Sequence, residues 1–107
     1  MKIVRTRTYL KDLKRMRVSD AERDALEVAI ASNPEEGDTM VGLKGVRKIR
    51  FAMGNRGKSG GGRAVYYVMI SDDAAIMLHA YAKNEKSDLS GGDRKALLAI
   101  LKELTDG

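Results

Sequence analysis

The chain has 107 residues, with 20 Lys and Arg against 15 Asp and Glu, a single His and no Cys. This length suits one hydrophobic core, so we expect residues 1–107 to form a single domain. The lack of cysteine excludes disulfides, thiolate metal sites and cysteine nucleophiles, and it suits a reducing cytoplasm. No apolar run approaches the ~18 residues of a membrane span, and the first residues lack the apolar stretch of a secretory signal. We therefore expect a cytoplasmic protein without membrane contacts.

The net charge of +5 is unevenly distributed. Residues 1–17 are basic and residues 18–40 are acidic, whereas residues 41–63 hold seven basic and no acidic side chains. Crowded like charges destabilise a fold unless an anion or another part of the protein compensates them. Nucleic acid is the simplest predicted partner, and an acidic protein is the alternative. The seven basic residues are Lys44, Arg47, Lys48, Arg50, Arg56, Lys58 and Arg63.

The first half of the chain predicts a short strand followed by two helices. Residues 2–5 favour a strand, and apolar side chains then recur at helical spacing from Tyr9 to Met16, which predicts a helix beginning at Thr6 or Thr8. Ser19 and Glu22 form a capping box that opens a second helix, ended by the Asn-Pro pair at 33–34. We expect a helical hairpin, basic on the first exposed face and acidic on the second, followed by a loop over 35–45.

The second half predicts three strands and a helix. From residue 48 the period becomes two, so that Lys48 and Arg50 share one strand face while Ile49 and Phe51 share the other. Residues 63–70 predict a central strand, residues 71–73 a turn, and residues 75–82 a third strand of an antiparallel meander. A cap over 90–93 precedes a terminal amphipathic helix. The order β-α-α-β-β-β-α predicts an α+β fold, with an antiparallel sheet, an N-terminal helical hairpin and a C-terminal helix.

The glycine-rich segment 54–62 contains Gly57-Lys58-Ser59, which invites comparison with a phosphate-binding P-loop. That motif needs a glycine where this chain has Ala52, and a helix where a strand is predicted. We interpret the segment as a hairpin connection, with Arg56 and Lys58 as candidate phosphate contacts.

No metal site or cofactor is predicted. One imidazole cannot supply a zinc site, and the carboxylates show no clustered spacing, so we expect His79 to pack at the edge of the core. The remaining chemistry belongs to cations on the strands, because Arg63 opens the strand after Lys48 and Arg50, while Lys83 and Lys86 follow the third. We expect these cations to converge on one patch. A basic sheet edge that discourages aggregation and a surface that docks an acidic protein are the alternatives.

Three ordered stretches carry a resemblance to a known family. They are GLKGVRKIRF at 42–51, GKSGGGRAVYY at 57–67 and YAKNEKSDLS at 81–90. With these stretches the chain resembles the RelE/HigB toxins of bacterial type II toxin–antitoxin modules, particularly their HigB-like branch. The resemblance implies a RelE-like fold, and a ribosome-dependent, metal-independent mRNA endoribonuclease that inhibits translation. A cognate antitoxin, HigA-like with a helix-turn-helix, would neutralise it.

The resemblance also assigns roles to single residues. Lys48 and Arg50 fall on the family's basic strand positions, Arg63 on its phosphate-binding arginine, and Lys83 and Lys86 on basic residues after the last strand. We therefore expect a catalytic set of Lys48, Arg50, Arg63, Tyr81 and Lys83, and an RNA-binding set of Lys44, Arg47, Arg56, Lys58 and Lys86.

Two positions depart from the RelE pattern. Asn84 stands where an arginine is often found, and Ser90 stands where a catalytic tyrosine can lie. Tyr81 and Lys83 are the substitutes we consider for the general base. The departures also favour an alternative, in which the chain is a non-catalytic basic module that binds RNA or protein.

Overall fold

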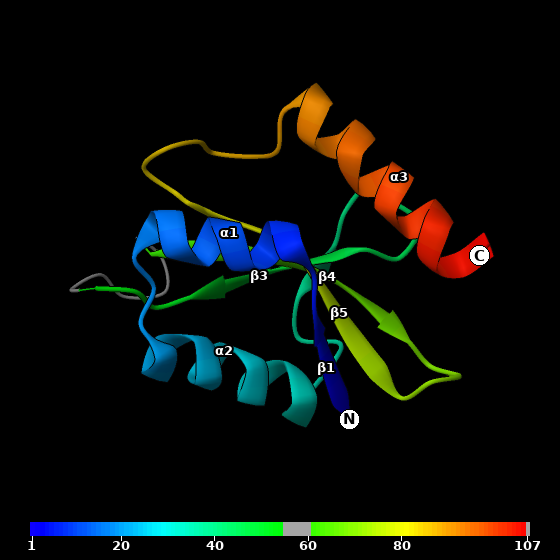
Figure 1. Cartoon of the computed structure of the whole chain (residues 1–107), viewed down its shortest axis with the longest axis horizontal. Helices are drawn as coiled ribbons and strands as arrows, with labels where there is room; N and C mark the ends of the chain where they lie inside the picture. Colours follow the sequence, from blue (N-terminus) through cyan, green and yellow to red (C-terminus); the bar gives the residue numbers. More distant parts are fainter. Residues whose placement is uncertain (55–60, 107) are drawn as a thin grey trace.

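The computed structural model describes residues 1–54 and 61–106, and it confirms the predicted α+β class (Figure 1). The element order has one strand more than expected, the two-residue strand β2. The elements are β1 (Lys2–Arg5), α1 (Arg7–Met16), α2 (Asp20–Ser32), β2 (Asp38–Thr39), β3 (Arg47–Phe51), β4 (Gly62–Met69), β5 (Ala74–Ala82) and α3 (Gly91–Asp106).

The strands form one open sheet in the order β1-β5-β4-β3-β2. Strands β3, β4 and β5 make the predicted antiparallel meander. Strand β1 instead joins the edge of β5 in parallel. The sheet is therefore mixed at this edge.

Both N-terminal helices begin where side-chain caps predict. The Thr6 side chain accepts a hydrogen bond from the Tyr9 N–H and caps α1. Ser19 and Glu22 form the reciprocal capping box of α2. Glu22 also accepts a hydrogen bond from the Gly54 N–H at 2.5 Å, so the end of the β3 segment is attached to the first turn of α2.

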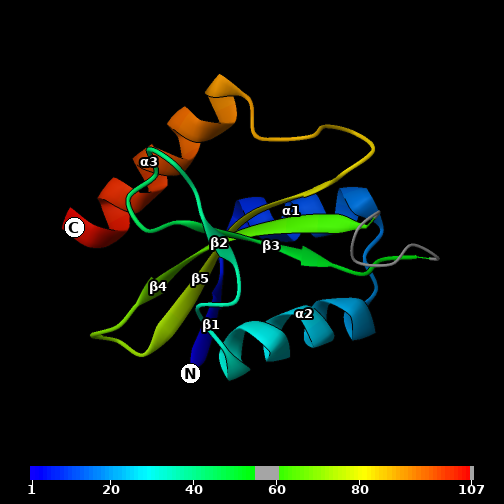
Figure 2. The ribbon, with the colours of Figure 1, turned by 180° about the vertical axis from the view of Figure 1, so that it is seen from behind.

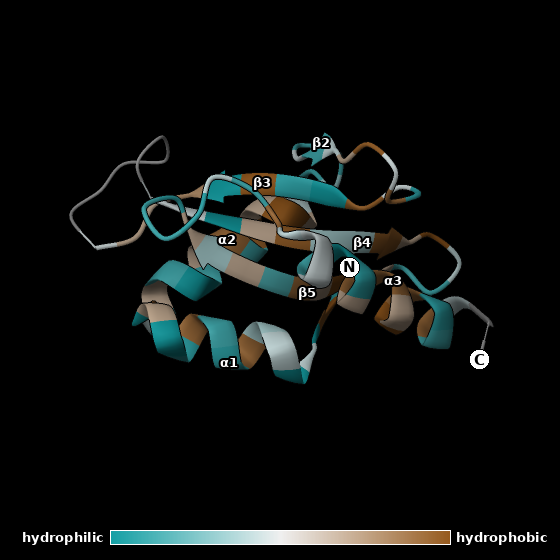
Figure 3. Cartoon of the chain, turned by 90° about the horizontal axis from the view of Figure 1, so that it is seen from above, coloured by the Kyte–Doolittle hydropathy of each residue, from teal (hydrophilic) through white to brown (hydrophobic). Residues whose placement is uncertain are grey.

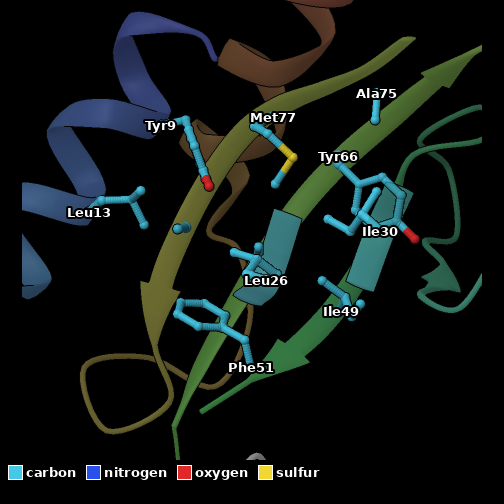
Figure 4. Close-up of a cluster of buried hydrophobic side chains, with 11 residues drawn as sticks. Tyr9, Leu13, Leu26, Ile30, Ile49, Phe51, Tyr66, Ala75 and Met77 are labelled. Atoms are coloured by element: carbon cyan, nitrogen blue, oxygen red, sulfur yellow. The ribbon is translucent and has the colours of Figure 1, made fainter. Parts of the chain in front are cut away.

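Two apolar clusters lie on opposite faces of the sheet. One face packs against α1 and α2 through residues such as Leu13, Leu26, Phe51 and Tyr66 (Figure 4). The other packs against α3, whose Leu97 and Leu101 are buried against the sheet. Figures 1 and 2 show α2 and α3 on opposite sides of the strands. Figure 3 shows the alternation of hydrophilic and apolar residues along β3 that lets this strand serve both faces.

A buried carboxylate ties β1 to both N-terminal helices. Glu27 of α2 is only 6% exposed; it receives hydrogen bonds from the Arg5 guanidinium at 2.7–3.2 Å and from the Tyr9 hydroxyl at 2.9 Å. Burial, with the nearby Glu27 charge, raises the pKa of Tyr9, so its hydroxyl stays a donor. The helical hairpin is thereby held in a set position against the sheet.

Helix α1 covers the part of β5 that β1 leaves uncovered. The Asp12 carboxylate accepts the Ala80 N–H at 3.0 Å, and Arg15 donates to the Ala80 carbonyl at 3.3 Å. Asp12 also lies 2.6 Å from Nδ1 of His79, which is 9% exposed as expected for a residue packed at the core edge. Burial raises the pKa of Asp12, but hydrogen bonds from His79, the Ala80 N–H and Arg15 outweigh it and lower the pKa. These contacts satisfy backbone groups that an open edge would otherwise expose.

Candidate functional site

The register of the sheet places three predicted site residues in one row. Arg50 of β3 lies opposite Arg63 of β4, which lies opposite Tyr81 of β5. Residues directly opposite share a face, with Cβ atoms about 4.5–5.5 Å apart. Lys48 lies two residues before Arg50 and therefore projects from the same face. This is the face covered by α3, because Tyr81 belongs to the cluster that α3 completes.

Tyr81 lies at the centre of this site but is fully buried. Its side chain packs in the cluster that includes Leu89 and Leu97, and the Lys86 ammonium lies 5.5 Å from the centre of its ring. Within the described part of the chain the Tyr81 hydroxyl finds no hydrogen-bond partner. Burial, with a smaller contribution from the Asp88 charge, raises the pKa of Tyr81 to about 12, although the Arg63 charge opposes the rise. The phenol is therefore protonated at neutral pH and can serve as a proton donor.

Arg63 is also buried, with 8% of its surface exposed. Its Nη1 donates to the Gly62 carbonyl at 3.1 Å. Gly62 lets β4 begin close to β3, because a Cβ at this position would lie 2.5 Å from two ring carbons of Phe51. This close approach sets where Arg63 enters the sheet, next to Arg50.

The turn after β5 brings two further predicted cations to the site. The Lys83 N–H donates to the Gly61 carbonyl at 3.0 Å, which extends the pairing with β4 beyond Tyr81. Glu85 fixes this turn, since its carboxylate accepts the Ala82 N–H at 2.9 Å and the Arg15 guanidinium at 2.8 Å. Lys86 donates to Asp93 at 2.5 Å. Lys83 is exposed, whereas Lys86 is half-buried beside Tyr81.

The other predicted RNA-binding residues are not brought to this cluster. Arg47 lies on the opposite face of β3 from Lys48, and its Nη1 donates to the carbonyls of Glu35 at 3.2 Å and Gly37 at 2.7 Å. Lys44 is exposed before β3, in a hollow shared with Tyr67 near the far end of β4 from Arg63. Arg56 and Lys58 fall outside the described residues.

The sequence alone assigned no role to two charged residues of the site, Asp88 and Arg94. The Asp88 carboxylate lies 3.5 Å from Lys48 and 3.7 Å from Arg94 of α3. Asp88 lies in the third family-like stretch, so the sequence offered one indication of its importance, whereas Arg94 follows that stretch.

Ser90 caps α3: its hydroxyl accepts the Asp93 N–H, and the Asp93 carboxylate accepts the Ser90 N–H. Where a catalytic tyrosine can lie in the family, this chain therefore has a helix cap.

Residues 1–54 and 61–106 contain neither a metal-binding cluster nor a membrane-spanning helix. No group of three His, Asp or Glu side chains is arranged to hold a metal ion in this part of the chain. None of the described helices combines the length and hydropathy needed to cross a bilayer.

The chain is thus a small α+β protein, in which a mixed sheet has α1 and α2 on one face, α3 on the other and a row of basic residues on the α3 face. The chain matches the family model of the RelE toxin of the RelE/RelB toxin–antitoxin system over residues 1–106. It therefore belongs to the RelE toxin family, and it is a toxin of a toxin–antitoxin module. The predicted resemblance is confirmed at the level of this family.

Solved structures agree with this fold. A mutant of Escherichia coli RelE in the free state is 16% identical with a TM-score of 0.60, and the match covers 94% of this chain and 96% of that one. The isolated E. coli RelE toxin is 18% identical with a TM-score of 0.57, covering 92% and 97%. The intact E. coli RelBE toxin–antitoxin complex matches with 19% identity and a TM-score of 0.57, covering 76% and 94%.

Proposed function

We propose that this toxin is an endoribonuclease of the mRNA interferase type, which cuts translated messages on the ribosome in the cytoplasm. The observation that carries the proposal is the row Arg50–Arg63–Tyr81 across three adjacent strands, with Lys48 on the same face. Three cations beside a protonated phenol suit a reaction in which a phosphodiester gains charge and the leaving oxygen gains a proton.

The proposed reaction uses the 2′-hydroxyl of the RNA as nucleophile. Its oxygen bonds to the adjacent phosphorus and loses its proton to a base, while the bond from phosphorus to the 5′-oxygen breaks. The products are a 2′,3′-cyclic phosphate and a 5′-hydroxyl. Tyr81 is the proposed donor of the proton to the 5′-oxygen, because its raised pKa keeps it protonated. Lys83, exposed two residues after Tyr81 in the chain, is the proposed acceptor of the 2′-hydroxyl proton.

The arginines and Lys48 have an electrostatic role in this proposal. A guanidinium presents a planar fork of donors to two phosphate oxygens, and Arg63 is held in place by burial and by its bond to Gly62. Removing one such donor from an oxyanion site costs about 2.7–4 kcal/mol of transition-state stabilisation in well-studied enzymes. Arg50 would oppose the remaining charge of the phosphorane, and Lys48, two residues away on the same strand face, would add positive charge from beside the reacting phosphate.

Burial supports dependence on the ribosome. Tyr81 is 0% exposed and Arg63 is 8% exposed in the chain alone, so free RNA would not reach either group without a rearrangement of the toxin. An enzyme that is opened only on its ribosomal target would leave free RNA intact. The sheet face that carries Lys48 and Arg50 could also bind a neutralising protein. We propose a cognate helix-turn-helix antitoxin of the HigA type as that partner.

The proposal is tested by expressing the toxin alone and mapping the 5′ ends of a translated message by primer extension. We expect new ends within codons, no cleavage of the same RNA without ribosomes, and relief by the antitoxin. Arg63→Ala should abolish cleavage and growth arrest while keeping the wild-type far-UV circular dichroism. If Arg63→Ala still cleaves, the site is wrong; if the wild type stalls ribosomes without new ends, the non-catalytic alternative holds.

A further inference from the structure

Asp88 lies between two cations that come from different elements. Its Oδ1 is 3.5 Å from Lys48 Nζ on β3, and its Oδ2 is 3.7 Å from Arg94 Nη2 on α3. The Asp88 side chain is 50% exposed, and the two cations are 29% and 35% exposed. Two cations thus point from separate elements at one solvent-facing anion, with one cation for each oxygen.

The other acids of this segment are bound differently. Asp93 contacts Lys86 at 2.5 Å and also closes the cap of α3 with Ser90. Glu85 contacts Arg15 at 2.8 Å and accepts a backbone N–H. Both carboxylates bind their cations through short hydrogen bonds, whereas Asp88 accepts a short hydrogen bond, at 2.8 Å, from the Leu89 N–H while its contacts with its two cations are long. Long, exposed ion pairs contribute little to stability, so this carboxylate is readily displaced.

A hollow of about 390 Å³ opens beside these charges. Arg94 is fixed at its rim, because its Nη1 donates to the Val41 carbonyl at 3.1 Å and so leaves Nη2 on the side of Asp88. This volume admits a phosphate with its attached sugar. The lining residues are Asp38, Thr39, Met40, Val41, Lys48, Asp88 and Arg94.

The hollow adjoins the row of the candidate site. Lys48 and Arg50 are two residues apart on the same strand face, which separates their Cα atoms by about 6.7 Å. That spacing is close to one step along the backbone of an extended RNA chain. A phosphate between Lys48 and Arg94 would therefore neighbour a phosphate held by Arg50 and Arg63.

We propose that Lys48 and Arg94 bind the mRNA phosphate next to the one that is cut, and that Asp88 occupies this place in the free toxin. This inference rests on the proposed function and assigns a binding residue, Arg94, and a resident competitor, Asp88. Asp88 is ionised at neutral pH, since its bond from the Leu89 N–H and the charges of Lys48 and Arg94 lower its pKa. Entering RNA would exchange one anion for another at the same pair of cations.

The test measures binding to ribosomes paused on an mRNA that carries 2′-O-methyl groups, because these block the nucleophile and keep the RNA intact. Asp88→Asn preserves the acceptor for the Leu89 N–H, and we expect it to lower Kd about fivefold, the effect of an exposed ion pair. Asp72→Asn is the matched control, since it changes net charge equally from an exposed turn at the other end of β4 and β5. It should leave Kd unchanged.

Arg94 variants test the cation. Arg94→Gln should raise Kd and reduce the slope of log Kd against log salt concentration by about 0.7, the value for one phosphate contact with single-stranded RNA. Arg94→Lys should restore most of the affinity and most of the salt dependence. In the Arg94→Gln background the gain from Asp88→Asn should shrink, because the displaced anion and the phosphate share this partner. Thermal melts verify that each variant is folded.

Ribosomes that hold no mRNA show whether the bound phosphate belongs to the message or to ribosomal RNA. The gain from Asp88→Asn should vanish on them; if it persists, the phosphate belongs to ribosomal RNA and the inference is wrong. The inference is also wrong if Asp88→Asn changes the Kd for ribosomes no more than Asp72→Asn does. A third contradicting result is an Asp88→Asn variant that binds only the antitoxin more tightly. Failure of the proposed function shows separately, as a wild-type toxin that neither cleaves unmodified mRNA nor requires mRNA to bind the ribosome.

Discussion

Arg63 and Tyr81 stand directly opposite each other on β4 and β5, and neither side chain is more than 8% exposed. A buried guanidinium beside a buried phenol is a costly arrangement, because both groups lose hydration when the protein folds. The Tyr81 hydroxyl finds no partner among the described residues to offset that loss. We interpret the Tyr81 hydroxyl as a polar group whose hydrogen bonding is completed by the substrate.

Tyr81→Phe separates function from stability. The variant removes only a buried hydroxyl without a partner in the described structure, so we expect the free energy of unfolding to rise by about 1 kcal/mol. Cleavage on ribosomes should fall about a hundredfold or more, because the proposed proton donor is lost. Urea denaturation and primer extension measure the two quantities. Unchanged cleavage would exclude Tyr81 as the acid.

Arg47 and Arg50 form a matched pair on opposite faces of one strand. Arg47→Gln loses charged hydrogen bonds to the Glu35 and Gly37 carbonyls, so we expect it to destabilise the fold by about 1–2 kcal/mol while KM for ribosomes stays within twofold. Arg50→Gln, at an exposed position, should reduce cleavage with no change in melting temperature. Our sequence-based assignment of Arg47 to RNA binding would be supported instead if Arg47→Gln raised KM.

The α3 cap should respond to acid. Burial raises the pKa of Asp93, but hydrogen bonds from Lys86 and Ser90 outweigh it and hold the pKa at about 2, below the ordinary value of 3.8. A lowered folded-state pKa means that this stabilisation is complete above pH 3.8 and is lost as the pH falls from there toward 2.

Asp93→Asn should therefore be less stable than the wild type by about 1–2 kcal/mol at pH 6, and the difference should disappear near pH 2. Urea denaturation across this range measures it, with Asp72→Asn as the control for net charge. A difference independent of pH would show that the carboxylate charge contributes nothing to the cap.

Local patterns were enough to predict most elements. The capping box at Ser19 and Glu22 predicts the start of α2, and the two-residue period of β3 predicts that Lys48 and Arg50 share a face. The same period places Arg47 on the opposite face of β3, but we assigned Arg47 to RNA binding because it is basic. The two-residue strand β2 and the parallel pairing of β1 were missed, because neither depends on residues near it in the chain.

The sequence by itself determined the chemistry available to this toxin. With one histidine and no cysteine, its predicted site is limited to lysines, arginines and a tyrosine, and its acid-free basic block predicted an anionic partner. Only the tertiary structure decided which of these residues meet. The register of β3, β4 and β5 aligns Arg50, Arg63 and Tyr81, and the packing of α3 brings Arg94 and Asp88 to Lys48. Such contacts join residues far apart in the chain, so they depend on packing and register that no local pattern contains.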